Sequence, residues 1–189
     1  MPRADAQRNL EALLCAARDE FAHSGVDVNV RAIAAKAGVG TATLYRHFPL
    51  RSDLIAAVFR HELDECVASA EHISGSHDPG EALNLWVQRY REFLQTKRGL
   101  AAALHSGDPA YESLPDYFHS QAAPALNGLL EKAAAAGVIR RGVDPMDILG
   151  AIANLCVPFP GSDSGTASRM VNLLLDGLRY MPNPSTQHD

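Results

Sequence analysis

The sequence predicts an all-α protein of about nine helices, and three observations support this fold class. Hydrophobic residues make up 47% of the 189-residue chain, which is enough for a sizeable core. Alanine is abundant and long stretches lack proline, a composition that favours helices. There is no sustained alternation of β-branched or aromatic residues between turn signals, as strands would require. We therefore expect helices and no sheet.

The first predicted helix spans residues 5–24, and Gly25 is expected to end it in a left-handed conformation. Asn29 is a good N-cap for a second helix, after which the chain must turn sharply at Gly38. The apolar residues of the first helix recur at steps of three and four and form one stripe: Leu10, Leu13, Leu14, Ala17 and Phe21.

A third, short helix is predicted to begin near residues 40–41 and to end after Phe48, because Pro49 stops it. Leu44 and Phe48 are four residues apart and point to the core, with Val39 beneath them. Two short helices joined by a tight glycine turn make a helix-turn-helix, whose second helix reads the major groove of DNA. The side chains left to face outward are those of Thr41, Ala42, Thr43, Tyr45, Arg46 and His47.

Six further helices are predicted beyond Pro49, separated by joints rich in glycine and proline. Ser52 is expected to cap the first of them. The predicted spans are residues 52–73, 79–97, 99–105, 116–136, 145–157 and 166–181.

The segment Ile33–Phe59, "IAAKAGVGTATLYRHFPLRSDLIAAVF", resembles the DNA-binding region of TetR-family transcriptional repressors. The family pattern is Ile-Ala-x-x-Ala-Gly-Val, a polar residue, Leu-Tyr-x-His-Phe, then a basic residue and a capped helix. The resemblance implies a helix-turn-helix DNA-binding domain over residues 1–50 and a helical ligand-binding and dimerisation domain over residues 51–181. We expect the tail, residues 182–189, to be disordered. The matching positions are Ile33, Ala34, Ala37, Gly38, Val39, Leu44, Tyr45, His47 and Phe48.

The resemblance also implies which residues contact DNA. Thr43, Tyr45 and His47 align with contacting positions of the recognition helix. Arg51 stands where the family usually has lysine, and it keeps the charge for a phosphate contact. The alternative interpretation is that Tyr45 and His47 only pack at a domain edge. The complete predicted DNA-binding set is Arg31, Gly40, Thr41, Thr43, Tyr45, Arg46, His47 and Arg51.

Charge and composition limit the function classes. The net charge of −5 argues against nucleic-acid binding by the chain as a whole, but residues 1–60 carry eight Lys/Arg against six Asp/Glu. This mildly basic third suits a local anionic partner. No apolar run approaches the roughly 20 residues of a membrane-spanning helix, and the N-terminus lacks the apolar centre of a signal peptide. We therefore expect a cytoplasmic protein without a membrane partner. The three cysteines are too widely spaced for a disulfide or zinc framework.

In the C-terminal two-thirds, aromatic side chains on one helical face suggest an apolar effector cavity between helices. A filled core is an equally good interpretation for any one of these residues. His105 and His119 are isolated histidines and do not indicate a metal site. The predicted cavity is lined by Trp86, Tyr90, Phe93, Leu104, Phe118 and His119.

The last two predicted helices carry apolar stripes that can form an intersubunit four-helix bundle. Burial within the chain is the alternative. Dimerisation is favoured because a single recognition helix reads too few bases, whereas a twofold pair places two helices in successive major grooves. The predicted dimer residues are Ile148, Ile152, Leu155, Val171, Leu174, Leu175 and Leu178.

These features predict a ligand-responsive regulator, most simply a repressor. It would bind a palindromic DNA operator as a homodimer and be released by a largely apolar small-molecule effector, with no cofactor. An enzyme built on a helical bundle is one alternative, but convergent acids, a nucleophile with its base and a phosphate-binding glycine loop are all missing from the sequence. The other alternative is a ligand-binding or interaction module without DNA binding.

Overall fold

The computed structural model describes the backbone of residues 2–180 and the side chains of residues 5–180. Within this range the chain forms nine α-helices, one 3₁₀ turn at Pro109–Tyr111 and no strand, which confirms the predicted all-α class. None of these helices is both long and apolar enough to span a bilayer. The predicted tail, residues 182–189, lies outside the described residues. The helices are Pro2–Ser24 (α1), Val30–Lys36 (α2), Thr41–His47 (α3), Arg51–Ser76 (α4), Pro79–Gly99 (α5), Ala101–Leu104 (α6), Leu114–Ala135 (α7), Pro145–Leu155 (α8) and Thr166–Arg179 (α9).

The chain divides into two compact units, and the division falls inside helices α4, α5 and α7. Of the described residues, the first unit contains 2–65 and 92–118, and the second contains 66–91 and 119–180. Helix α4 therefore contributes residues to both units. The predicted domain boundary after residue 50 stays a prediction.

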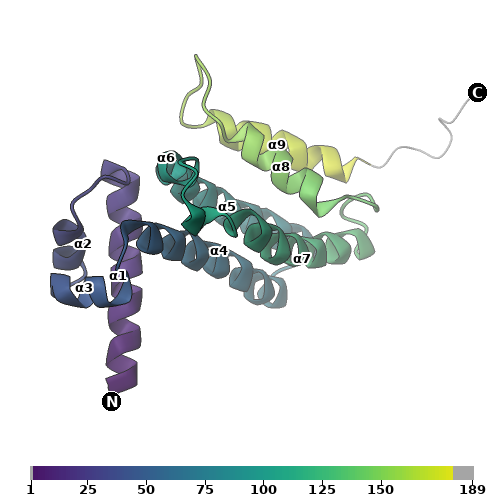
Figure 1. Cartoon of the computed structure of the whole chain (residues 1–189). Helices are drawn as coiled ribbons and strands as arrows, with labels where there is room; N and C mark the ends of the chain where they lie inside the picture. The colour runs from purple at the N-terminus through teal and green to yellow at the C-terminus, as the bar shows by residue number, and fades with distance from the viewer. Residues whose placement is uncertain (1, 181–189) are drawn as a thin grey trace, which may run out of the picture. The chain divides into compact units, whose positions relative to one another are not determined.

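In the first unit, helices α2 and α3 lie beside α1 (Figure 1). Phe21, Ile33 and Leu44 from these three helices are almost completely buried and fill the space between them. The end of α5 packs closely on the end of α1: a β-carbon at Gly99 would lie 3.2 Å from the carbonyl oxygen of Phe21. A residue without a side chain is thus favoured at this contact.

The helix ends from α1 to the start of α4 follow the predicted signals, with one exception. Gly25 and Gly38 have φ angles of 76° and 70°, so they supply the left-handed turns after α1 and α2. Asn29 Oδ1 accepts a hydrogen bond from the backbone N–H of Arg31, as an N-cap should. The expected cap by Ser52 was wrong. Helix α4 already begins at Arg51, and the carboxylate of Asp53 reaches back to the backbone N–H of Leu50 at 2.9 Å.

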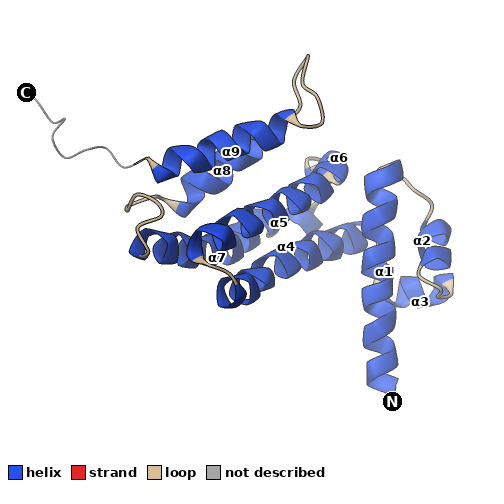
Figure 2. Ribbon diagram, turned by 180° about the vertical axis from the view of Figure 1, so that it is seen from behind, coloured by secondary structure: helices blue, strands red, loops and turns tan. Residues whose placement is uncertain are grey.

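In the second unit, helices α8 and α9 form a hairpin and lie side by side (Figure 2). Asp144 caps α8 by accepting hydrogen bonds from the backbone N–H groups of Met146 and Asp147. The inner faces of both helices are apolar and buried, and they pack in the same unit as the N-terminal part of α5, which supplies Trp86.

Candidate nucleic-acid interface

Helix α3 is held in place by its apolar side. Leu44 and Phe48 are buried, as their four-residue spacing predicted. The turn before α3 is closed by backbone hydrogen bonds, among them Val39 N–H to the carbonyl of Ala34 at 3.0 Å. This turn fixes where α3 begins, and the two buried side chains fix its rotation about its own axis.

The opposite side of α3 is uncovered. Tyr45 is 50% exposed although it is aromatic, and Arg46 and His47 are exposed beside it. Thr43 is half-buried, and its hydroxyl accepts a hydrogen bond from Arg46 Nη2 at 3.0 Å. This contact orients the guanidinium along the helix without neutralising its charge. The exposed face therefore offers phenol, guanidinium and imidazole groups, all of which can donate hydrogen bonds.

The remaining predicted DNA-binding residues flank this face. Gly40 is exposed and is the N-cap of α3, without a side-chain hydrogen bond, and Thr41 is half-buried as the first helical residue. Arg31 is exposed at the start of α2. Arg51 differs from the others because it is half-buried and its Nη1 donates to the backbone carbonyl of Val26. Its guanidinium therefore also has a structural role, which the sequence pattern did not predict.

Three acidic residues of the first unit, on α1 and α4, are paired with basic side chains. Lys36 Nζ lies 3.4 Å from Asp19 Oδ2 and 3.2 Å from Glu20 Oε1. Arg18 bonds both Asp19 and Glu62, and Glu62 is only 6% exposed. Burial acts to raise the pKa of Asp19, but the hydrogen bonds and positive charges of Arg18 and Lys36 together outweigh it and hold that pKa below its usual value. Among the described residues, by contrast, neither Arg31 nor Arg46 has a carboxylate partner. These two charges are left available for an anion.

The predicted effector-cavity residues of the second unit are mostly core residues. The rings of Trp86 and Tyr90 are stacked, with centroids 5.7 Å apart, and both side chains are almost completely buried. Trp86 Nε1 donates to the carbonyl of Cys66 at 3.0 Å, and the Tyr90 hydroxyl donates to the carbonyl of Leu149 at 3.3 Å. Burial raises the pKa of Tyr90, which keeps this hydroxyl protonated as a donor. His119 is exposed.

The cavity residues of the first unit are less uniform. Phe93 is buried, with its ring edge-on to Phe59 at 5.4 Å and stacked on Phe118 at 6.0 Å. Phe118 is only half-buried, and Lys97 Nζ lies 5.7 Å from the centre of its ring. Leu104 is also half-buried. Phe93 is therefore a core residue, and Phe118 and Leu104 are the two that keep accessible surface in this unit.

Most of the predicted dimer residues lie inside their own chain. Five of the seven are buried in their own chain, so they are not free to form an exposed interface; only Leu155 and Leu174 are half-buried. On each helix the more hydrophobic stripe is the one that is buried in the chain itself. The five buried residues are Ile148, Ile152, Val171, Leu175 and Leu178.

A second stripe on each of these helices is exposed or half-buried, and of its members only Leu174 belongs to the predicted dimer set. On α8 and just beyond it, the residues recur at steps of four, three and four: Met146, Gly150, Ala153 and Val157. On α9 and just beyond it they are Met170, Leu173, Leu174, Gly177 and Tyr180, and Leu173 is 71% exposed. Apart from its own stretch of helix, a β-carbon at Gly150 or Gly177 would meet no described atom within 4 Å. The spacing of these residues was visible in the sequence, but the more hydrophobic stripe beside them hid it.

A metal centre finds no support in the part of the chain that is described, since no group of three His, Cys, Asp or Glu side chains there could hold a metal ion. The interface described above is therefore made by the exposed side chains of α3 and their neighbours.

Comparison with known proteins agrees with this geometry. Residues 13–58 match the family described as bacterial regulatory proteins, tetR family, and residues 78–180 match the C-terminal domain described as transcriptional regulator SbtR-like. An HTH-type transcriptional regulator of Staphylococcus aureus is 26% identical over 127 residues, which is 62% of this chain and 69% of that protein.

Two solved structures are similar over almost their whole length. A TetR transcriptional regulator from Streptomyces coelicolor is 35% identical with a TM-score of 0.76, over 89% of this chain and 97% of that one. A TetR transcription regulatory protein from Mycobacterium vanbaalenii is 32% identical with a TM-score of 0.73, over 95% of this chain and 100% of that one.

Proposed function

Because this chain belongs to the TetR family of transcriptional regulators, we propose that it is a ligand-responsive repressor. It binds a palindromic operator as a homodimer and is released by a small-molecule effector. Regulators of this family bind DNA, dimerise and bind small-molecule ligands, and they are not enzymes. The family thus decides against the enzyme alternative, and the proposal concerns how this chain carries out regulation.

The observation that supports DNA recognition most strongly is the division of α3 into two sides. Leu44 and Phe48 anchor the helix, while Tyr45, Arg46 and His47 extend from the other side. A tyrosine next to cations suits the edge of a duplex, where its ring packs on sugars and its hydroxyl reaches phosphate. Arg46 has the donors to reach a guanine edge or a phosphate. The alternative of a module without DNA binding leaves this face unexplained.

The exposed stripes of α8 and α9 support a dimer. An apolar side chain as exposed as Leu173, next to Met170 and Tyr180, forms the kind of patch that marks an interaction surface. Gly150 and Gly177 have open space where a side chain would be, so a second hairpin can approach the backbone there. We assign the dimer face to these stripes. Leu174 is the residue that they share with the dimer set predicted from the sequence.

Release by an effector needs a path from the C-terminal helices to α3. Helix α4 is continuous from Arg51, three residues after Phe48, to Ser76. A ligand that prefers the arrangement with lower DNA affinity shifts the population toward it through this helix. Among the apolar members of the predicted cavity, the half-buried Phe118 and Leu104 are the ones that keep surface for such a ligand.

Selection of bound fragments from genomic DNA tests the proposal directly. The bound fragments are expected to share a palindrome, and an anisotropy assay on that palindrome should show an affinity that falls steeply with salt. The Arg46→Ala variant should lower the slope of log affinity against log salt by about one if Arg46 contacts a phosphate. An Arg98→Ala variant, which changes an exposed arginine on α5, serves as the matched control and should leave the slope unchanged. A selection that returns no common sequence would refute operator binding.

The same assay tests the effector. A library of small apolar compounds is screened for those that raise the dissociation constant of the protein–DNA complex. Release of the DNA by at least one compound, without loss of helix content, is the expected result. If no compound changes operator affinity, the ligand-responsive part of the proposal is wrong while operator binding can still stand.

A further inference from the structure

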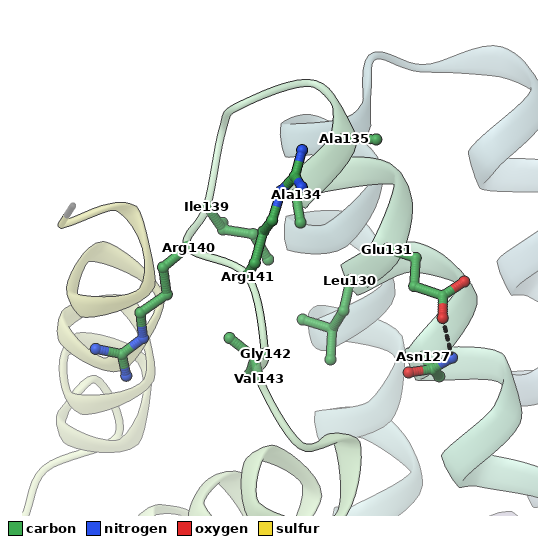
Figure 3. A pocket seen from close by; sticks show the side chains of 10 residues that line it. All are labelled: Asn127, Leu130, Glu131, Ala134, Ala135, Ile139, Arg140, Arg141, Gly142 and Val143. Atoms are coloured by element: carbon green, nitrogen blue, oxygen red, sulfur yellow. Dashed lines mark hydrogen bonds between the residues drawn. The ribbon is translucent and has the colours of Figure 1, made fainter.

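A cavity of about 320 Å³ lies in the second unit, between the end of helix α7 and the segment that leads to α8 (Figure 3). Its apolar surface comes from Leu130 and Ala134 of α7 and from Ile139 and Val143 of the returning segment. This volume falls at the lower end of the range of small-molecule sites. None of the residues assigned above to DNA, dimer or effector binding lines it.

The walls of this cavity are fixed by the backbone. Gly137 and Gly142 have φ angles of 71° and 73°, so each supplies a left-handed turn that returns the chain toward α7. Between them, the backbone N–H of Arg140 donates to the carbonyl of Leu178 at 2.9 Å, which ties the segment to the end of α9. The cavity is therefore formed in the absence of a ligand, and filling it requires little ordering of the chain.

The two arginine side chains at the cavity point in different directions. In Figure 3 the side chain of Arg141 extends from the returning segment toward Ala134, whereas that of Arg140 points the opposite way, toward a neighbouring helix. Among the described residues, neither guanidinium has a carboxylate partner. Glu131 lies on α7 before Ala134, and its carboxylate accepts a hydrogen bond from Asn127 Nδ2 at 2.8 Å.

We propose that this cavity binds a small organic anion, a monocarboxylate with a compact apolar body, and that Arg141 anchors its carboxylate. The apolar body covers the surface that the half-buried Ala134 and Val143 leave at the cavity, and removing this surface from water favours binding. Leu130 and Ile139 are already buried and give the cavity a firm apolar wall. The guanidinium of Arg141 is suited to a planar carboxylate because it can donate two parallel hydrogen bonds. Glu131 disfavours a second negative charge and so selects monoanions over dianions.

This site is separate from operator binding and from the effector residues assigned above, so its test does not depend on DNA. Three probes with related ring bodies and different charge are suitable: para-fluorophenylacetate, its neutral amide and para-fluorophenethylammonium. Fluorine NMR of the probe gives the affinity for the full-length protein, and amide chemical shifts of the protein locate the bound probe. Of the three probes, para-fluorophenylacetate should bind most tightly. It should change the amide chemical shifts of Ala134, Ile139 and Val143.

Three variants decide the role of each charge. Arg141→Gln should weaken binding of the acetate about tenfold, because a charge-assisted hydrogen-bonded pair is lost. Arg140→Gln is the matched control, with the same loss of charge one residue away, and should change the affinity less than about twofold, since its guanidinium points away and is screened. Glu131→Gln should strengthen acetate binding.

The proposal is wrong if Arg141→Gln and Arg140→Gln weaken binding equally, since the effect would then be one of net charge. It is also wrong if the ammonium probe binds as well as the acetate, or if the shifted amides lie outside residues 127–143. Helix content measured by circular dichroism should be the same for all three variants, because each substituted side chain is exposed.

Discussion

Helices α3 and α9 each carry a face that the chain itself leaves uncovered, and the chemistry of the two faces is opposite. On α3 the uncovered side chains are Tyr45, Arg46 and His47, which are polar or cationic. On α9 the most exposed apolar side chain is Leu173, next to Met170. A face of donors and positive charge suits a hydrated anionic polymer, whereas an apolar face suits a surface of its own kind. The comparison teaches that the chemistry of an uncovered face, rather than its exposure alone, indicates its partner.

The largest expected effect is the loss of stability when a buried side chain is removed, compared with an exposed one. Trp86 fills the core of the unit that contains α9, so Trp86→Ala should lower the free energy of unfolding by about 3–5 kcal/mol. Leu85→Ala, one residue away on an exposed side of α5, is the control and should cost less than about 1 kcal/mol. Urea denaturation followed by circular dichroism gives both values. Equal losses for the two variants would mean that Trp86 is not a core residue.

The next effect concerns the apolar face of α9. Leu173→Glu should weaken self-association by about 2–4 kcal/mol, because it places two carboxylates in a desolvated interface. Asn172→Glu adds the same charge at an adjacent, exposed position on the polar side of the helix and should have little effect. Analytical ultracentrifugation across a concentration series measures both dissociation constants. If both variants remain dimers, the second stripe of α9 is not the interface.

These two predictions also show where sequence patterns lose information. The three- and four-residue periods correctly predicted that α8 and α9 exist and which side of each is apolar. They did not show that Ile148, Ile152 and Leu178 face the chain's own core, because a buried stripe and a dimer stripe have the same period. Likewise, Trp86 and Phe118 share an aromatic pattern, but only three-dimensional packing separates the buried ring from the half-buried one.

Helix α3 was easier to predict because its signals are local. Gly38, Pro49 and the Leu44–Phe48 pair define where the helix begins and ends and which side faces inward, and none of these depends on distant residues. The polar and aromatic residues on the remaining side are therefore left at the surface, where they can contact a partner. What local reasoning missed is Arg51, whose guanidinium bonds the carbonyl of Val26, twenty-five residues earlier.

A smaller effect tests the polar face of α3. Tyr45→Ala should weaken operator binding by about 1–3 kcal/mol while changing the free energy of unfolding by less than about 0.5 kcal/mol, because the ring is half exposed. Tyr45→Phe keeps the ring and removes only the hydroxyl, so it should lose part of this affinity. Fluorescence anisotropy on the selected operator gives the binding values. A stability loss that equals the binding loss would instead support a packing role for Tyr45.

The smallest expected effect concerns the ion pairs of Asp19 with Arg18 and Lys36. The folded-state pKa of Asp19 is lowered, so its contribution to stability is present above its unfolded pKa of about 3.9 and is lost as the pH falls through the folded value. Since the side chain is 44% exposed, Asp19→Asn should cost only about 0.5 kcal/mol at neutral pH. The difference from the native chain should vanish in acid. A difference that persists at low pH would point to a packing effect in place of the ion pair.

The central claim is that two chains, joined through the outer stripes of α8 and α9, present their α3 helices to one palindrome. Its most direct test is the stoichiometry of the complex, measured by light scattering of the protein bound to the selected operator. We expect two native chains per duplex, and a loss of the complex with Leu173→Glu at concentrations where the native chain still binds. One chain per duplex, or equal binding to a scrambled duplex in dilute salt, would contradict it.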